Sequence, residues 1–320
     1  MRKGSELAHP HDENDSESSD PIENQRTGQT AQSTDPAPHQ RPVRTIWKIL
    51  AFAGMAIAGV GFAGLVSIIV GVVFGQEITP AVLYMIAAPV VILSSWACLR
   101  LFDHRPLAAV GIGFDRAWMR HGVGGGLLGA GLLGICVVIF RIAGWAETTD
   151  FPGGAIPWAG LLIGAVHTLG LAIHEEVQCR GYPFQLLLRW NPAVAVVLTG
   201  AFFVAMHLPN PGGLAWSAML NMFLLHLLLA ACYLRTRSLW LPIGVHFGWN
   251  YMMGYVLGMP VSGVLYSSSA FSTTMSQGIW TGHAFGPEGG MIVTAALALA
   301  AALAWTLLPQ RHPTPDLLAE

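Results

Sequence analysis

Seven residues near the middle of the chain combine side chains that acid–base chemistry uses. The segment HEEVQCR (residues 174–180) holds one histidine, two glutamates and one arginine, and it directly follows the apolar run WAGLLIGAVHTLGLAI. If that run lies in lipid, ionisable groups at its end cost several kcal/mol, which normally marks a functional site. The segment differs from the zinc motif HExxH by the glutamine at position 178.

The two adjacent glutamates have different neighbours on a helix. Glu176 lies four residues before Arg180, which is the favourable order for an ion pair on one helical face. Glu175 has Cys179 at the same spacing, so its carboxylate stays available for another partner. The sequence therefore predicts one structural carboxylate beside one that is free for chemistry.

A histidine in the next apolar segment is expected at the same depth as this pair. In the segment FFVAMHLPNP, Phe203 and His207 lie four residues apart and share a helical face. Asn191 stands in a predicted turn, as many residues after Glu175 as it lies before His207. Two antiparallel helices joined there bring the carboxylate and the imidazole to similar depth.

A third polar pair occurs in the segment SLWLPIGVHFGWNYMMG, where His246 and Asn250 are again four residues apart. A polar pair that only joins two membrane helices is one interpretation. The other is a site, because a free carboxylate, two imidazoles and a carboxamide fall on three predicted helices between residues 175 and 250. We favour a functional site, because these four groups come from three predicted helices within one stretch of the chain.

The composition indicates the kind of scaffold that holds these residues. The chain has 320 residues, of which 53% are hydrophobic and only 11% are charged, and its mean hydropathy is +0.53. Soluble domains carry about 25% charged residues, so a multi-pass membrane protein is the expected class. A net charge of −2 gives no indication of a nucleic-acid partner. The four cysteines lie in apolar segments without a CxxC pair, which predicts free, buried thiols.

Apolar segments of roughly 20 residues are long enough to cross a bilayer. The fold class predicted is all-α, a polytopic transmembrane bundle of about eight spans. They are expected near residues 46–75, 81–102, 122–143, 158–180, 193–207, 213–234, 239–258 and 289–308. In domain terms, we expect a disordered cytoplasmic tail at 1–44, a transmembrane domain at 45–308 with its catalytic core at about 158–258, and a short cytoplasmic tail at 309–320.

Positive charges orient this bundle. If the chain alternates through eight spans, nearly all cations of the membrane domain and its flanks fall on one side, which the positive-inside rule assigns to the cytoplasm. Arg141 is the exception, and both termini are predicted to be cytoplasmic. The cations on the predicted cytoplasmic side are Arg41, Arg44, Lys48, Arg100, Arg105, Arg116, Arg120, Arg189, Arg235, Arg237 and Arg311.

The third predicted span contains GGGLLG (residues 124–129), which matches the nucleotide-binding pattern GxGxxG. No strand precedes it, so we do not interpret it as a nucleotide site. Glycines four residues apart instead predict close packing of two membrane helices.

Together, the three polar motifs resemble those of one protease family. EExxxR (Glu175, Glu176, Arg180), FxxxH (Phe203, His207) and HxxxN (His246, Asn250) occur in the order found in the CPBP family, which comprises CAAX prenyl proteases and bacteriocin-processing enzymes, also called Abi proteins. The resemblance covers about residues 158–258.

This resemblance implies an intramembrane glutamic endopeptidase that needs no cofactor. Its catalytic residues would be Glu175 as the base on a water, His207 as the group that orients this water, and His246 with Asn250 as oxyanion donors. Supporting roles fall to Glu176, Arg180 and Phe203. The implied partners are the lipid bilayer and a membrane-embedded or membrane-associated peptide or protein substrate, and a bacterial inner (plasma) membrane is the implied location.

Two other function classes remain open from the sequence. A zinc-dependent protease can use one glutamate and two histidines as ligands, here Glu175, His207 and His246. A membrane transporter or scaffold can also hold intramembrane acids and histidines, although transporters usually show paired repeats, which are not seen here. The segment 259–288, rich in Ser, Thr and Gly, is expected to fold back as a lid over the site.

Overall fold

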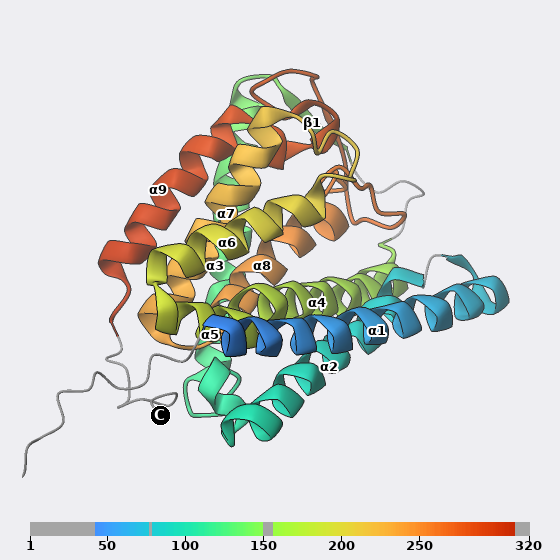
Figure 1. Cartoon of the computed structure of the whole chain (residues 1–320). Coiled ribbons are helices and arrows are strands. Elements are labelled where there is room, and N and C mark those ends of the chain that lie inside the picture. Colours follow the sequence, from blue (N-terminus) through green and yellow to red (C-terminus); the bar gives the residue numbers. More distant parts are fainter. Residues whose placement is uncertain (1–41, 77–78, 150–155, 311–320) are drawn as a thin grey trace, which may run out of the picture. The chain divides into compact units, whose positions relative to one another are not determined.

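The computed structural model describes residues 42–76, 79–149 and 156–310 (Figure 1). The predicted N-terminal tail lies outside the described residues up to residue 41, and helix α1 begins at Pro42, a little earlier than expected. Of the predicted C-terminal tail, residues 311–320 also lie outside the described residues.

The described residues are mostly helical, and every predicted apolar segment contains an α-helix. Short π- and 3₁₀-helical turns extend or connect some of these helices, among them Leu99–Asp103, Leu107–Val110 and Met252–Val256. The α-helices are α1 (Pro42–Phe74), α2 (Thr79–Cys98), α3 (Trp118–Ile142), α4 (Trp158–Arg180), α5 (Tyr182–Trp190), α6 (Pro192–His207), α7 (Trp216–Thr236), α8 (Trp240–Tyr251) and α9 (Met291–Leu307).

Four of these helices, α1, α2, α3 and α7, are long and apolar enough to cross a membrane, and α6 and α9 are shorter apolar helices. Helix α4 has 23 residues but ends in the charged segment that contains Glu175, Glu176 and Arg180. Helix α8 has only 12 residues before it continues as a π-helical turn. The structure therefore supports an integral membrane protein with several spans, while the number eight rests on the sequence pattern.

The prediction of an all-α fold is wrong in one respect, because two short strands pair. Strand β1 (Ala146–Thr149) follows α3, and strand β2 (Ser272–Met275) precedes α9. They form an antiparallel two-stranded sheet in which Ala146 faces Met275. Each strand has four residues, too few for a clear alternating pattern, and the partner lies more than a hundred residues away in the sequence, so no local signal indicates the pairing.

Local sequence explains how α4 is followed by a turn and an antiparallel helix. The first helix ends at Arg180, and Pro183 stands in the first turn of α5, where a missing backbone N–H is tolerated. The side chain of Asn191 accepts hydrogen bonds from the backbone N–H groups of Ala193 and Val194 at 2.8 and 3.1 Å, which caps α6. The predicted turn near Asn191 is thus confirmed.

Helices α3 and α8 pack so closely that their backbones touch. A Cβ atom on Gly129 would collide with the carbonyl oxygen of Val245, and one on Gly248 would collide with that of Gly126. This confirms the prediction that the glycines of α3 serve helix packing. Since α8 carries His246, the glycine contact fixes one of the candidate site's helices.

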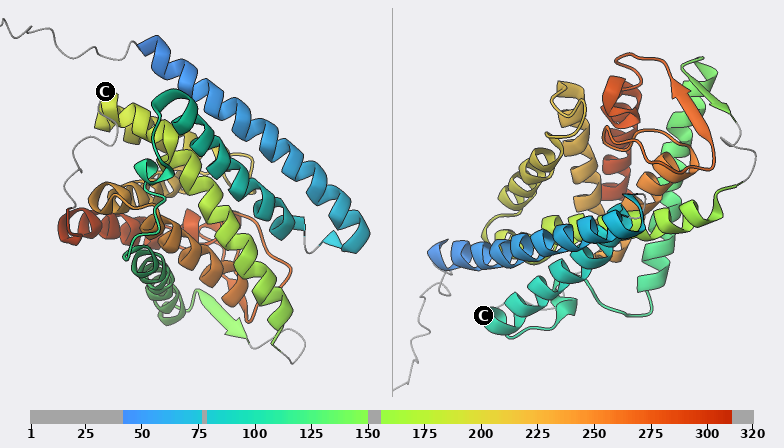
Figure 2. Two further views of the ribbon diagram at one scale, coloured as in Figure 1. Left: turned by 90° about the horizontal axis from the view of Figure 1, so that it is seen from below. Right: turned by 90° about the vertical axis from the view of Figure 1, so that its right-hand side faces the viewer.

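The remaining helices pack in groups around α4 and α7. Figure 2 shows α1, α2 and α4 side by side, and α9 packs along α7. Each group encloses apolar side chains, and the largest fully buried one is Trp249 of α8. All four cysteines are free and buried, as predicted.

Candidate active site

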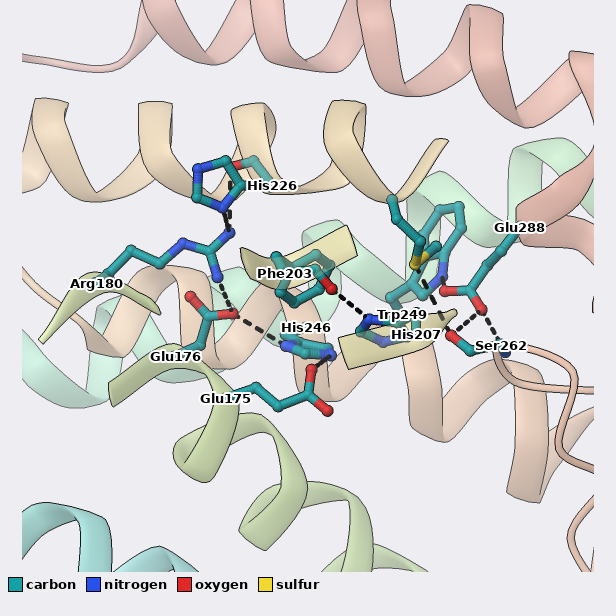
Figure 3. Close-up of polar contacts among 11 residues, drawn as sticks. Glu175, Glu176, Arg180, Phe203, His207, His226, His246, Trp249, Ser262 and Glu288 are labelled. Carbon is teal, nitrogen blue, oxygen red and sulfur yellow. Dashed lines mark hydrogen bonds and ion pairs between the residues drawn. The ribbon is translucent and has the colours of Figure 1, made fainter. Parts of the chain in front are cut away.

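The predicted ion pair between Glu176 and Arg180 is present. Arg180 Nη1 donates to Glu176 Oε1 at 3.0 Å, and both side chains are fully buried (Figure 3). The guanidinium also lies over the ring of Phe203, 5.3 Å from its centroid, which gives it a cation–π contact. Phe203 of the second motif therefore supports the charged pair of the first.

Arg180 has a second partner that the sequence analysis did not identify. Its Nη2 lies 2.8 Å from Nδ1 of His226 in α7 and 3.2 Å from the backbone oxygen of the same residue. A guanidinium only donates, so His226 Nδ1 accepts and the ring's proton is assigned to Nε2, which lies 3.4 Å from Thr199 Oγ1. His226 is completely buried in the otherwise apolar stretch MFLLHLLLA, and this isolated polar residue was the only sequence signal.

His246 lies between the two adjacent glutamates. Its Nδ1 is 3.0 Å from Glu176 Oε1, and its Nε2 is 3.8 Å from Glu175 Oε2 (Figure 3). A carboxylate can only accept, so Nδ1 is assigned as the donor and Nε2 is the nitrogen that faces Glu175. The helices α4 and α8 thus place an imidazole directly beside the carboxylate that lacks an Arg partner.

His207 is oriented by its own helix. Its Nδ1 lies 2.8 Å from the backbone oxygen of Phe203, one turn earlier in α6, and the two rings are 4.7 Å apart. Because a carbonyl oxygen only accepts, Nδ1 carries the proton and Nε2 presents a lone pair. The four-residue spacing of the FxxxH motif therefore sets both the orientation of the His207 ring and its tautomer.

A pocket of about 400 Å³ brings together residues from the three motifs. Glu175, His207 and Asn250 all line it, and His246 contacts Glu175 at its edge. Within the described residues, neither Glu175 Oε2 nor Asn250 Oδ1 has a hydrogen-bond partner, although both atoms are buried. The other lining residues are Gln76, Pro80, Tyr84, His167, Leu171, Met206, Asn210, Tyr255, Val261, Ser262, Val264, Leu265, Tyr266 and Ser267.

Part of the segment 259–288 forms one wall of this pocket, from Val261 to Ser267. Tyr266 in this wall stacks on Tyr255 with ring centroids 4.8 Å apart. Burial, reinforced by the nearby Tyr255 and by the carboxylates of Glu288 and Glu175, raises the pKa of the Tyr266 hydroxyl well above its usual value. Tyr266 therefore stays a neutral hydroxyl at the edge of the site. Whether the segment moves as a lid remains a prediction.

A buried carboxylate that the sequence analysis missed holds this wall in place. Glu288 Oε2 accepts from the backbone N and the Oγ of Ser262, at 2.6 and 2.9 Å. Glu288 Oε1 accepts from Trp249 Nε1 at 3.0 Å, and Trp249 directly precedes Asn250 (Figure 3). Glu288 stands in a glycine-rich loop with no recognisable motif, so the sequence did not predict its role.

The geometry does not favour the zinc alternative. Among the described residues, no group of three or more His, Cys, Asp or Glu side chains is arranged to hold a metal ion. In particular, His246 makes its short contact to Glu176 rather than to Glu175, from which its Nε2 lies 3.8 Å away.

Comparison with known proteins gives one match. Residues 154–252 match the family described as type II CAAX prenyl endopeptidase Rce1-like. The matched stretch contains all three polar motifs, from Glu175 to Asn250. No curated protein and no solved structure matches the chain.

Proposed function

We propose that this chain is an intramembrane endopeptidase in which Glu175 activates a water molecule. Its residues 154–252 match the Rce1-like type II CAAX prenyl endopeptidase family, which is a family of peptidases. The observation that carries the proposal is the pocket that Glu175, His207 and Asn250 share inside the matched region. Its substrates are peptide segments of membrane-embedded or membrane-associated proteins.

Glu175 acts as the general base in this proposal. The carboxylate takes one proton from a water molecule. The lone pair on His207 Nε2 accepts a hydrogen bond from the O–H group that remains, which orients the water oxygen toward the scissile carbonyl carbon. The resulting hydroxide adds to that carbon and gives a tetrahedral oxyanion. When the C–N bond breaks, the proton held by Glu175 passes to the departing amine nitrogen, and the products are a carboxyl group and an amine.

The oxyanion is stabilised by Asn250 and His246. Asn250 donates from Nδ2, while Nε2 of His246 donates when the ring is an imidazolium, because Nδ1 already donates to Glu176. Before the water reacts, the carboxylates of Glu175 and Glu176 balance the imidazolium and Arg180. Afterwards the oxyanion replaces the negative charge that Glu175 loses, so the site stays neutral as a whole. Donors preorganised in this way contribute about 3–4 kcal/mol each to transition-state binding.

The decisive variant is Glu175→Gln, assayed on a membrane-embedded reporter peptide in detergent or vesicles. We expect loss of cleavage with unchanged abundance and thermal stability, since Glu175 has no short ion pair to lose. Gln178→Ala, on the same helix but outside the pocket, is the matched control and should cleave normally. Near-normal cleavage by Glu175→Gln would refute the mechanism. Cleavage that a chelator abolished and zinc restored would instead favour the metal alternative.

The proposed topology is eight spans with both termini in the cytoplasm, in a bacterial inner membrane. The alternation of cation-rich and cation-poor helix ends supports it. A reporter enzyme fused after Glu320 should be active only in the cytoplasm, and activity restricted to the other side would contradict this topology. Comparing membrane peptides from cells with the active and the Glu175→Gln chain would identify the substrate.

A further inference from the structure

We infer that His167 determines specificity by binding a hydroxyl-bearing side chain of the substrate, tyrosine above all, about three or four residues from the scissile bond. This inference rests on the proposed function, because it concerns the peptide that Glu175 is proposed to cleave. It follows from the place of His167 in the pocket, from the tyrosines around its ring, and from a ring nitrogen that has no partner.

One wall of the pocket runs along helix α4. His167, Leu171 and Glu175 all line the pocket, and their spacing of four residues places them on one face of the helix. Eight residues of helix rise about 12 Å, so His167 lies about that far from Glu175 along the helix axis. An extended chain covers about 3.3 Å per residue, so a peptide along this wall reaches His167 about three or four residues from the bond that Glu175 attacks.

Three tyrosines from separate elements surround the ring of His167. Between ring centroids, Tyr84 of α2 lies 5.5 Å away, Tyr266 5.0 Å, and Tyr255 of the π-helical turn 5.9 Å. All three tyrosines line the same pocket. The part of the pocket around His167 is therefore an aromatic chamber, in which the ring of a substrate side chain finds stacking or edge-to-face partners.

Two glycines of α4 let these tyrosines approach His167. Gly164 and Gly170 stand three residues before and three residues after it. A Cβ atom on Gly164 would collide with the ring of Tyr255. One on Gly170 would lie 2.9 Å from the backbone oxygen of Tyr84, where α2 and α4 lie side by side (Figure 2). The sequence of α4 thus keeps room for the tyrosines on both sides of the histidine.

One ring nitrogen of His167 has a partner inside the protein and the other does not. Nδ1 lies 2.9 Å from the hydroxyl oxygen of Tyr255, whereas Nε2 has no hydrogen-bond partner among the described residues. The side chain of His167 is only 4% exposed and lines the pocket, so a partner for Nε2 has to come from a molecule in the pocket. A polar atom buried without a partner is unfavourable, and a substrate group that supplies the partner is therefore bound more tightly.

A hydroxyl group suits Nε2 in either tautomer of the ring. If Tyr255 donates to Nδ1, Nε2 carries the proton and donates, and if Nδ1 donates to Tyr255, Nε2 accepts. A hydroxyl can serve both, because it has one donor and two acceptor lone pairs. An acidic side chain is disfavoured, since Glu175 lines the pocket and no lysine or arginine does. Tyrosine combines the hydroxyl with a ring that matches the aromatic walls.

Reporter peptides cut by the native chain test this inference. The reporters carry tyrosine or phenylalanine at each position from two to five residues on either side of the bond that mass spectrometry identifies as cut. At one position, we expect kcat/KM for tyrosine to exceed that for phenylalanine roughly tenfold, because a site that hydrogen-bonds a hydroxyl rejects the analogue without it. Equal cleavage at every position would overturn the inference. Faster cleavage with phenylalanine, or with lysine, which the tyrosine rings could attract, would do so too.

Two variants separate a role of His167 in specificity from a purely structural one. His167→Phe and Tyr255→Phe both remove the hydrogen bond between the two side chains, but only His167→Phe removes Nε2. His167→Phe should cut the tyrosine and phenylalanine reporters at equal rates. Tyr255→Phe should keep the preference for tyrosine, even where both rates fall. A preference that survived in His167→Phe, or that disappeared in both variants, would contradict the role assigned to Nε2.

Binding to the Glu175→Gln chain keeps this test separate from the proposed function. The affinities of the tyrosine and phenylalanine peptides for this variant, measured in detergent, should differ in the same direction although neither peptide is cut. Cleavage by the native chain without any preference would leave the glutamate mechanism intact and refute the role of His167. A preference in binding, without cleavage by the native chain, would support the role of His167 and refute the proposed peptidase function.

Discussion

His246 makes its short hydrogen bond to Glu176, at 3.0 Å, and faces Glu175 only at 3.8 Å. Glu176 therefore serves two partners through the same oxygen, Arg180 along α4 and His246 across to α8. The carboxylate predicted from the sequence to be structural is thus the one that orients the imidazole of the proposed oxyanion site.

Replacing Glu176 by Gln should lower both stability and activity. The change leaves Arg180 without a counter-charge in a buried position, and breaking a buried pair costs about 3–5 kcal/mol of folding free energy. The measurement is Tm in detergent beside turnover of the membrane-embedded reporter. Replacing Glu176 and Arg180 together by leucine and methionine should recover part of the Tm but none of the activity. A stable, inactive Glu176→Gln variant would show that the roles of the two glutamates are reversed.

His226 should matter because it holds Arg180 from the side opposite Glu176. His226→Leu removes the acceptor, and a hydrogen bond to a charged group is worth about 1.5–3 kcal/mol. His226→Asn places an amide oxygen near the position of Nδ1 and should keep a higher Tm and more activity than the leucine variant. Equal behaviour of the two variants would mean that the hydrogen bond to Arg180 contributes nothing.

The glycine contact between α3 and α8 should tolerate no added methyl group. Gly129→Ala forces the two backbones apart, and overpacking of this kind costs about 1–3 kcal/mol. Activity should fall as well, because α8 carries His246 and Asn250. Gly124→Ala is the control on the same helix, where a Cβ meets nothing, and it should keep or slightly raise the Tm. A lower Tm for the control than for Gly129→Ala would contradict the packing argument.

Glu288→Gln tests whether the pocket wall must be fixed. A glutamine side chain offers one acceptor oxygen in place of two and directs an amide N–H group at the donors of Ser262 or Trp249, which costs about 1–3 kcal/mol. We expect KM for the reporter to rise more than kcat falls, since Glu288 holds the wall and does not line the pocket. Glu147→Gln, an exposed carboxylate in β1, should leave both constants unchanged.

Local signals in the sequence were sufficient to place the helices and part of the site. Apolar length located every long helix, Asn191 identified the turn, and the i,i+4 spacing of Glu176 and Arg180 identified their pair. The roles of His226 and Glu288 could not be predicted from the sequence, because each side chain binds a partner more than 30 residues away in the chain and neither belongs to a local pattern. The pairing of the two strands could not be predicted for the same reason.

The burial of the proposed catalytic groups restricts the conformation in which a substrate can be cut. In a helix, each backbone carbonyl accepts a hydrogen bond from the N–H group four residues later, and the side chains surround the backbone to a width of about 10 Å. Glu175 and Asn250 line a pocket of about 400 Å³, and Glu175 Oε2 and Asn250 Oδ1 are buried. The attacked carbonyl must give up its helical hydrogen bond to reach the oxyanion donors, so we expect the chain around the scissile bond to uncoil before it reaches Glu175. Glycine and proline lower the cost of uncoiling, so segments interrupted by these residues should be cut fastest, and uninterrupted leucine-rich helices should be spared.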